Sequence, residues 1–124
     1  DDVKKMMYKH DILVLPSIFD GWGAVVNEAL NSGMRVVCSD RCGASALLGE
    51  SWRGSVFRSG DMQNFLDVME QQLRIGIFSD KDREEIEVWC RANISGEAAT
   101  DYFLQICSYQ LGERNISPSA PWKR

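Results

Sequence analysis

The sequence predicts an α/β fold in which a parallel sheet is flanked by helices. Three short strand-like runs alternate with longer segments whose apolar residues recur at helical spacing. The first two runs, residues 12–15 and 36–38, are continuously apolar, which is typical of strands buried on both faces of a parallel sheet. Alternating strands and helices imply crossover connections, and these join parallel strands.

The first third of the chain predicts a helix, a strand, a loop and a second helix. Val3, Met6 and Met7 indicate a short amphipathic helix, and Pro16 stops the strand 12–15. A loop with two glycines spans residues 17–23. From residue 24 the apolar spacing becomes helical, with one face formed by Val26, Ala29, Leu30 and Gly33. Gly33 occupies the position where glycine commonly ends a helix.

The middle of the chain predicts two further strands. Residues 35–39 form the second strand, and a turn at 40–43 leads into a short helix at 44–48. Residues 55–58 form the third strand, between Gly54 and Gly60. Asp61 is expected to be the N-cap of the next helix. The apolar stripe of that helix consists of Phe65, Val68, Met69 and Leu73.

The C-terminal third predicts two helices and a tail. Ser79 and Asp82 have the spacing of a capping box, and their helix carries Ile86, Trp89 and Cys90. Ser95 is expected to cap the last helix, whose apolar residues are Ala99, Tyr102, Phe103, Ile106 and Cys107. We assign residues 1–111 to one domain and expect the polar residues 112–124 to form a frayed tail.

Composition excludes several classes of protein. The 124 residues suffice for one domain, and 44% apolar with 26% charged residues is an ordinary globular balance. A net charge of −4 with no block of Lys or Arg argues against a nucleic-acid partner. Three strands are few for such a sheet and the chain begins with Asp, so we expect a piece of a longer protein.

The cysteines and the single histidine predict no metal site. Cys38, Cys42, Cys90 and Cys107 include no C-x-x-C pair, and a four-cysteine zinc site needs two close pairs. They are therefore expected to be buried free thiols. His10 is expected at a helix end or on the surface.

The loop after the first strand is the best candidate for a site, because ligands of open parallel sheets bind beyond the carboxyl ends of strands. Gly21 and Gly23 allow a close backbone approach, and the following helix offers unpaired N–H groups to a phosphate. Glu28 could accept two hydrogen bonds from vicinal hydroxyls, and Asp20 could reach another polyol. Each feature alone is more often a turn or a solvated carboxylate, and only their combination on one strand–loop–helix unit favours a site.

Residues 16–33, with the sequence PSIFDGWGAVVNEALNSG, resemble the signature P-S-x-x-E-G-F-G-x-x-x-x-E-A-x-x-x-G of retaining group 1 glycosyltransferases (family 4). Residues 35–40 resemble the P-V-V-A-S segment that follows in that family. Gly54, Val56-Phe57 and Gly60-Asp61 match its G-x-L-V-x-x-G-D stretch. The resemblance covers residues 1 to about 111.

The resemblance implies a GT-B enzyme, in which two Rossmann-like domains face each other across a cleft. This chain would be the incomplete C-terminal half, which binds the nucleotide-sugar donor. Glu28 would hold the ribose hydroxyls and Asp20 would face the donor sugar, so these two are the expected catalytic residues. Backbone N–H groups would meet the sugar and the diphosphate at Gly21, Trp22, Gly23, Ala24 and Val25.

The family also implies partners and a location. The donor, expected to be a UDP-sugar, is a substrate, so no cofactor is expected. The acceptor would be a glycan or lipid-linked molecule, bound through an N-terminal domain, as in O-antigen or capsule polysaccharide biosynthesis. The location would be cytoplasmic. Peripheral association of the full-length enzyme with the inner membrane is also compatible with the family. We expect this chain alone to be inactive, and turnover of a nucleotide-sugar by it would contradict that.

The sequence departs from the family pattern at the candidate site. Asp20 stands in place of Glu, which shortens the reach by about 1.5 Å, and Trp22 stands in place of Phe. Residues 41–45, RCGAS, replace G-G-x-P-E. The family's diphosphate-binding Arg and Lys normally lie upstream, and no convincing substitute is found among Arg35, Arg41, Arg53 and Arg58.

Two other readings stay open. The chain could be a non-catalytic Rossmann-like nucleotide-binding or interaction module. A receiver-like phosphoacceptor domain is disfavoured, because Asp20 lacks the acidic pair that such a site needs.

A sheet with uncovered edges also predicts self-association of the chain. A monomer in light scattering at high concentration would refute this prediction.

Overall fold

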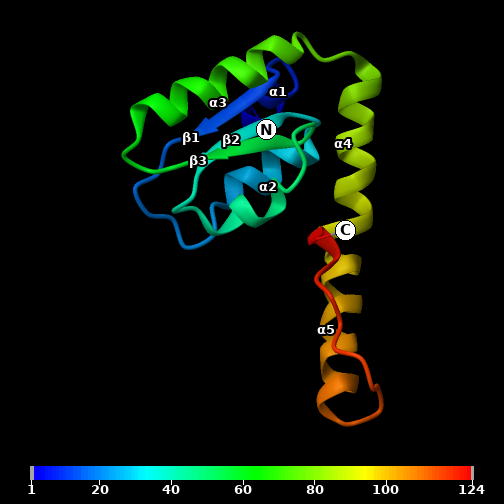
Figure 1. The fold of residues 1–124 in the computed structure, drawn as a ribbon. Coiled ribbons are helices and arrows are strands. Elements are labelled where there is room, and N and C mark those ends of the chain that lie inside the picture. The colour runs from blue at the N-terminus through cyan, green and yellow to red at the C-terminus, as the bar shows by residue number, and fades with distance from the viewer. Residues whose placement is uncertain (1, 124) are drawn as a thin grey trace.

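The computed structural model describes residues 2–123 and contains a three-stranded parallel sheet in the order β1-β2-β3. The strands are β1 (Ile12–Leu15), β2 (Arg35–Ser39) and β3 (Gly54–Phe57). The sheet lies between α3 (Met62–Ile75) on one side and α2 (Ala24–Asn31) on the other (Figure 1). The predicted α/β class and the parallel strands are confirmed.

The central strand organises two apolar clusters. Side chains alternate across a strand, so Val36 and Cys38 face the larger cluster with α2, whereas Val37 faces Phe57 and Val68 of α3. Every residue of β2 is buried. All four residues of β1 are only half-buried, and the prediction that this strand is buried on both faces is therefore wrong. The reason is the strand order, which leaves β1 at an edge of the described sheet.

The end of α2 is as predicted. Ser32 is the C-cap and Gly33 follows with φ +70°. The amide of Gly33 donates to the carbonyl of Leu30, and the amide of Met34 donates to that of Ala29, both at 3.0 Å. These two bonds form a Schellman motif, which turns the chain directly into β2.

Between β2 and β3 the chain forms η1 (Gly43–Leu47), a 3₁₀ helix in place of the short helix expected at 44–48. β3 begins one residue earlier than expected, at Gly54, where a side chain would meet the carbonyl of Val36. The Asp61 side chain accepts from the amide of Asn64, which confirms the predicted N-cap of α3. The inner face of α3 differs from the prediction, because Gln72 is buried and Leu73 is 63% exposed.

The N-terminal helix is α1 (Asp2–Met7), and only Met7 of its predicted apolar face is buried. α4 (Asp80–Asn93) begins with the predicted capping box of Ser79 and Asp82, and it packs on α2. Ile86 and Cys90 are its buried residues.

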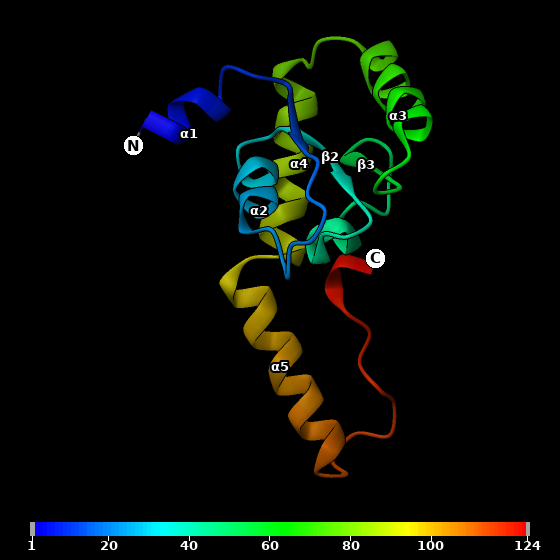
Figure 2. The same ribbon diagram turned by 90° about the vertical axis from the view of Figure 1, so that its left-hand side faces the viewer.

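α5 (Gly96–Gln110) extends away from the sheet (Figure 2). Ser95 caps it as predicted, but none of its residues is buried, so its apolar residues do not face the core as the sequence suggests. The end of the tail is not frayed. The chain runs back to the 3₁₀ helix η2 (Pro121–Lys123), which contacts η1, α4 and α5 and buries Ala120 and Pro121.

Candidate functional site

The candidate site lies where β1 and β2 end, at the carboxyl edge of the sheet. The loop after β1 pairs there with the loop after β2 through an isolated parallel bridge between Asp20 and Cys42. The amide of Asp20 donates to the carbonyl of Arg41 at 3.0 Å, and the amide of Gly43 donates to the carbonyl of Asp20 at 3.2 Å. The two loops, which are about 20 residues apart in sequence, are thus held as one unit.

Asp20 is half-buried, and one of its oxygens is used within the loop. Oδ1 accepts the amide N–H of Trp22 at 3.1 Å, which is an Asx-type turn. The ring of Trp22 is 44% exposed, and its Nε1 donates to Oδ1 of Asn27 at 2.8 Å. The structure therefore brings Asp20 and Trp22 together and ties both to the start of α2.

Gly23 is the N-cap of α2 and has φ +84°, a conformation that favours glycine. It has no side chain to bond the first amides of the helix. Within residues 2–123, the N–H groups of Ala24 and Val25 donate no hydrogen bond. Ala24 is exposed and Val25 half-buried. These amides and the positive end of the helix dipole form a potential anion-binding surface beside Asp20.

Glu28 lies on a different side of the site. It is exposed, one turn into α2, and it lines a groove of about 540 Å³ with Asn31 and three residues of α1, namely Val3, Lys4 and Met7. In the described part of the chain it makes no side-chain hydrogen bond to the loop 20–23. Its carboxylate is therefore free to accept from a ligand in the groove.

Two residues of the site were not singled out from the sequence. Cys42 is buried, and its thiol donates to the carbonyl of Trp22 at 3.1 Å. At Gly43 a side chain would collide with the carbonyl of Gly21, so only glycine lets the two loops approach. The R-C-G segment was visible in the sequence, but its contacts lie about 20 residues away and no local pattern shows them.

Two of the four arginines considered as diphosphate ligands lie away from the candidate site. Arg35 is the first residue of β2 and Arg53 directly precedes β3, so both lie at the opposite edge of the sheet from Asp20, and both are at most 2% exposed. Burial lowers the pKa of each guanidinium, although nearby carboxylates act in the opposite direction. Arg58 lies at the carboxyl edge and pairs with Asp61 at 3.2 Å. Neither buried cation can reach a ligand near α2.

The cysteines are free thiols, as predicted, and Cys38, Cys42 and Cys90 are buried as expected; Cys107 is only half-buried, because α5 lies away from the core. Burial raises the pKa of Cys38 and of Cys90 to about 12, so both stay protonated at neutral pH. Nδ1 of His10 donates to the carbonyl of Met6 at 2.7 Å, which is the predicted place at a helix end. Residues 2–123 hold no cluster of three His, Cys, Asp or Glu side chains suited to a metal.

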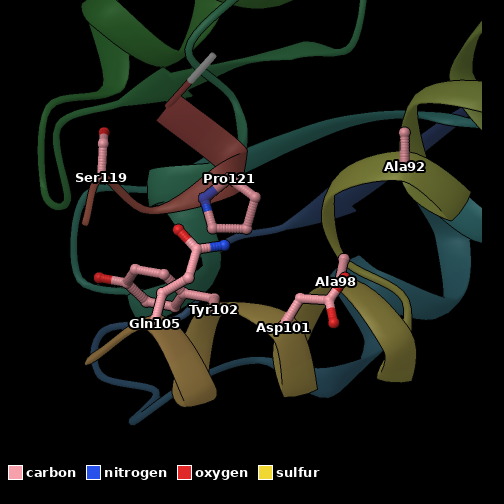
Figure 3. A pocket seen from close by; sticks show the side chains of 7 residues that line it. All are labelled: Ala92, Ala98, Asp101, Tyr102, Gln105, Ser119 and Pro121. Carbon is pink, nitrogen blue, oxygen red and sulfur yellow. The ribbon is translucent and has the colours of Figure 1, made fainter. Parts of the chain in front are cut away.

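A second cavity, of about 110 Å³, lies between α4, α5 and the tail (Figure 3). Asp101, Tyr102 and Gln105 of α5 line it together with Ser119 and Pro121. Figure 1 shows these elements on the opposite side from the loops that follow β1 and β2. The cavity is therefore separate from the candidate site. No helix within residues 2–123 has the length and apolar character needed to cross a bilayer.

Comparisons with known proteins agree with the geometry. The sequence model of the family described as glycosyl transferases group 1 matches residues 1–87, from α1 into α4. The match includes the whole sheet, the loops at its carboxyl edge and α2. No curated protein matches the chain. Because the family match covers well over half of the 124 residues, the chain belongs to the group 1 glycosyltransferases.

Proposed function

We propose that this chain is the donor-binding part of a retaining hexosyltransferase of the GT-B type. The full enzyme would move a sugar from a nucleotide-diphosphate donor, a UDP-sugar, to a glycan or lipid-linked acceptor. The observation that carries the proposal is the start of α2. Its unbonded amides adjoin Asp20 at the carboxyl edge of a parallel sheet, within the region that matches the family.

The geometry supports separate binding roles for the start of α2 and for Asp20. Amides of Gly23, Ala24 and Val25 would bind the diphosphate, since a helix N-terminus attracts phosphate oxygens. Donors already aimed at the leaving diphosphate stabilise the charge that develops on it during transfer. The second oxygen of Asp20 would accept a sugar hydroxyl, because Oδ1 is already bonded to Trp22.

Glu28 would hold the nucleoside. A carboxylate can accept one hydrogen bond on each oxygen, which suits the vicinal hydroxyls of a ribose. The groove that Glu28 lines adjoins α1, and Lys4 on its opposite wall adds a cation. With the ribose bound in this groove, the attached diphosphate would extend toward the first turn of α2.

The test is calorimetric titration of the chain with UDP-, GDP- and ADP-sugars. We expect one of these donors to bind, and Glu28→Gln to weaken binding at least tenfold, because the amide keeps only one acceptor oxygen and a lost charge-assisted hydrogen bond is worth about 1.5–3 kcal/mol. Glu84→Gln, at an exposed glutamate on α4, is the matched control and should leave binding unchanged.

The outcomes separate the two readings of the chain. Specific binding that Glu28→Gln removes and Glu84→Gln retains supports donor binding. Absence of binding by any donor would refute it in favour of a non-catalytic module. We further expect no sugar transfer by this chain alone, because acceptor binding is assigned to a separate N-terminal domain; measurable turnover would overturn that assignment.

A further inference from the structure

We propose that Cys42 is a positioning residue, whose thiol holds the loop after β1 in the conformation that presents the first turn of α2 to the donor. The proposal rests on the proposed function, since it concerns the same site. It adds a residue that departs from the family pattern and contacts no ligand itself. Cys42 makes a hydrogen bond to the loop, packs against Gly23 and lies opposite Asp20 in the backbone bridge.

The hydrogen bond joins the thiol to the loop. Cys42 is 2% exposed, and its Sγ lies 3.1 Å from the carbonyl oxygen of Trp22. The same oxygen accepts the amide of Ala44 at 2.6 Å. Both lone pairs of this carbonyl are thus used by the loop after β2, which fixes the peptide between Trp22 and Gly23.

The packing contact concerns Gly23. A side-chain Cβ built on Gly23 would lie 2.5 Å from Sγ of Cys42 and 3.3 Å from Cδ2 of Leu15. The thiol therefore occupies the space directly over the N-cap of α2. Its size sets how far Gly23 can move, and hence where the free amides of Ala24 and Val25 point.

The backbone on either side of Cys42 adds a third constraint. Cys42 is the residue opposite Asp20 in the parallel bridge, and its neighbours Arg41 and Gly43 make the two hydrogen bonds to the backbone of Asp20. Cys42 thus lies between the two residues that hold Asp20, while its own thiol bonds the turn that carries the amides. A change in its side chain would shift the amides relative to Asp20, because the bridge holds Asp20 in place.

The thiol donates a hydrogen bond to the carbonyl of Trp22, so a hydroxyl can replace it and a methyl group cannot. We therefore compare Cys42→Ser with Cys42→Ala. Cys107→Ala, at a half-buried cysteine on α5, is the matched control. The free energy of unfolding of each variant is measured by urea titration, so that only folded protein is compared.

The first measurement is amide hydrogen exchange, which needs no ligand. Ala44 and Val26 donate to the carbonyls of Trp22 and Gly23, so their protection reports on the loop. We expect Cys42→Ala to accelerate exchange at these two amides about fivefold, the equivalent of a hydrogen bond of ~1 kcal/mol. Amides of β2 should not change, and Cys42→Ser should restore protection.

The second measurement is donor affinity by the titration described above. Cys42→Ala should weaken binding of the nucleotide-sugar about fivefold, and Cys42→Ser should recover it. If the wild-type chain binds no donor, the proposed function fails while the exchange result still decides whether Cys42 holds the loop. Unchanged exchange in Cys42→Ala, equal acceleration in both variants, or acceleration spread over the whole sheet would each overturn the positioning role. Unchanged affinity with accelerated exchange would overturn its link to the donor.

Discussion

At the scale of single residues, the candidate site depends on glycines and on one thiol more than on charged side chains. Gly23 supplies a left-handed N-cap, Gly43 lets two loops touch, and Cys42 fills the space between them. One carboxylate oxygen of Asp20 accepts a hydrogen bond from its own loop. Among the predicted side chains, Glu28 therefore has both carboxylate oxygens available for a ligand.

Replacing Gly23 by Ala tests this dependence. We expect a loss of about 1–3 kcal/mol in the free energy of unfolding, because an alanine at φ +84° is strained and its methyl meets Cys42. Urea denaturation measures the loss. Gly21→Ala is the control, since a Cβ at Gly21 meets nothing within 4 Å, and an equal loss in that variant would contradict the explanation.

The buried thiols predict how stability changes in alkali. The pKa of Cys38 is raised from 9.0 to about 12 in the folded protein, mainly by burial. Above pH 9 the unfolded chain releases a proton that the folded chain keeps, so the free energy of unfolding falls as the pH rises toward 12. The difference in the free energy of unfolding between wild type and Cys38→Ala should therefore become smaller as the pH rises from 8 to 10.5. A constant difference for Cys38→Ala over this pH range would refute the shift.

At the scale of elements, α2 is determined largely by local chemistry, whereas α3 depends on distant partners. The guanidinium of Arg35, at the start of β2, donates to the carbonyls of Gln72 and Gly76 at 2.7 Å each. It lies 4.1 Å from the ring centroid of Phe78, which follows α3. The Gln72 amide in turn donates to the carbonyl of Ser51 and the hydroxyl of Ser55. A polar network thus fastens the end of α3 to the sheet.

Removal of Arg35 tests this network. Arg35→Ala should reduce the free energy of unfolding by on the order of 3 kcal/mol, since it leaves a cavity and removes the donor to the carbonyls of Gln72, which is buried, and Gly76. Arg58→Ala removes an arginine whose side chain is 73% exposed and pairs with Asp61, and it should cost less than about 1 kcal/mol. Similar costs for the two variants in urea denaturation would show that the buried network is not what holds α3.

At the scale of the whole molecule, the C-terminal third is held by its two ends. α5 has no buried residue and exposes Phe103 and Leu104, yet the tail folds back beside it (Figure 2). Trp122 lies 5.6 Å from Tyr102, ring centroid to ring centroid and edge to face, and it packs on the main apolar cluster. The tail therefore links α5 to the body of the protein.

Truncation of this tryptophan tests the link. Trp122→Ala should lower the free energy of unfolding by about 2–4 kcal/mol through lost apolar burial, and it should make α5 more sensitive to limited proteolysis. Ile116→Ala, in the exposed part of the tail, should change neither quantity. Unaltered proteolysis of α5 in Trp122→Ala would show that the tail does not restrain it.

The sequence by itself determined the order of the elements, the caps at Asp61, Ser79 and Ser95, the glycine that ends α2, and the family signature around Asp20 and Glu28. These features depend on residues within one or two turns of each other, so their physical causes are local. Burial was decided only by the tertiary structure: β1 became an edge, Gln72 replaced Leu73 on the inner face of α3, and α5 was left uncovered. The bond from Cys42 to Trp22 was decided in the same way, because it joins residues 20 positions apart. Contacts of this kind follow from which strands pair and how two loops meet, and no local periodicity encodes that choice.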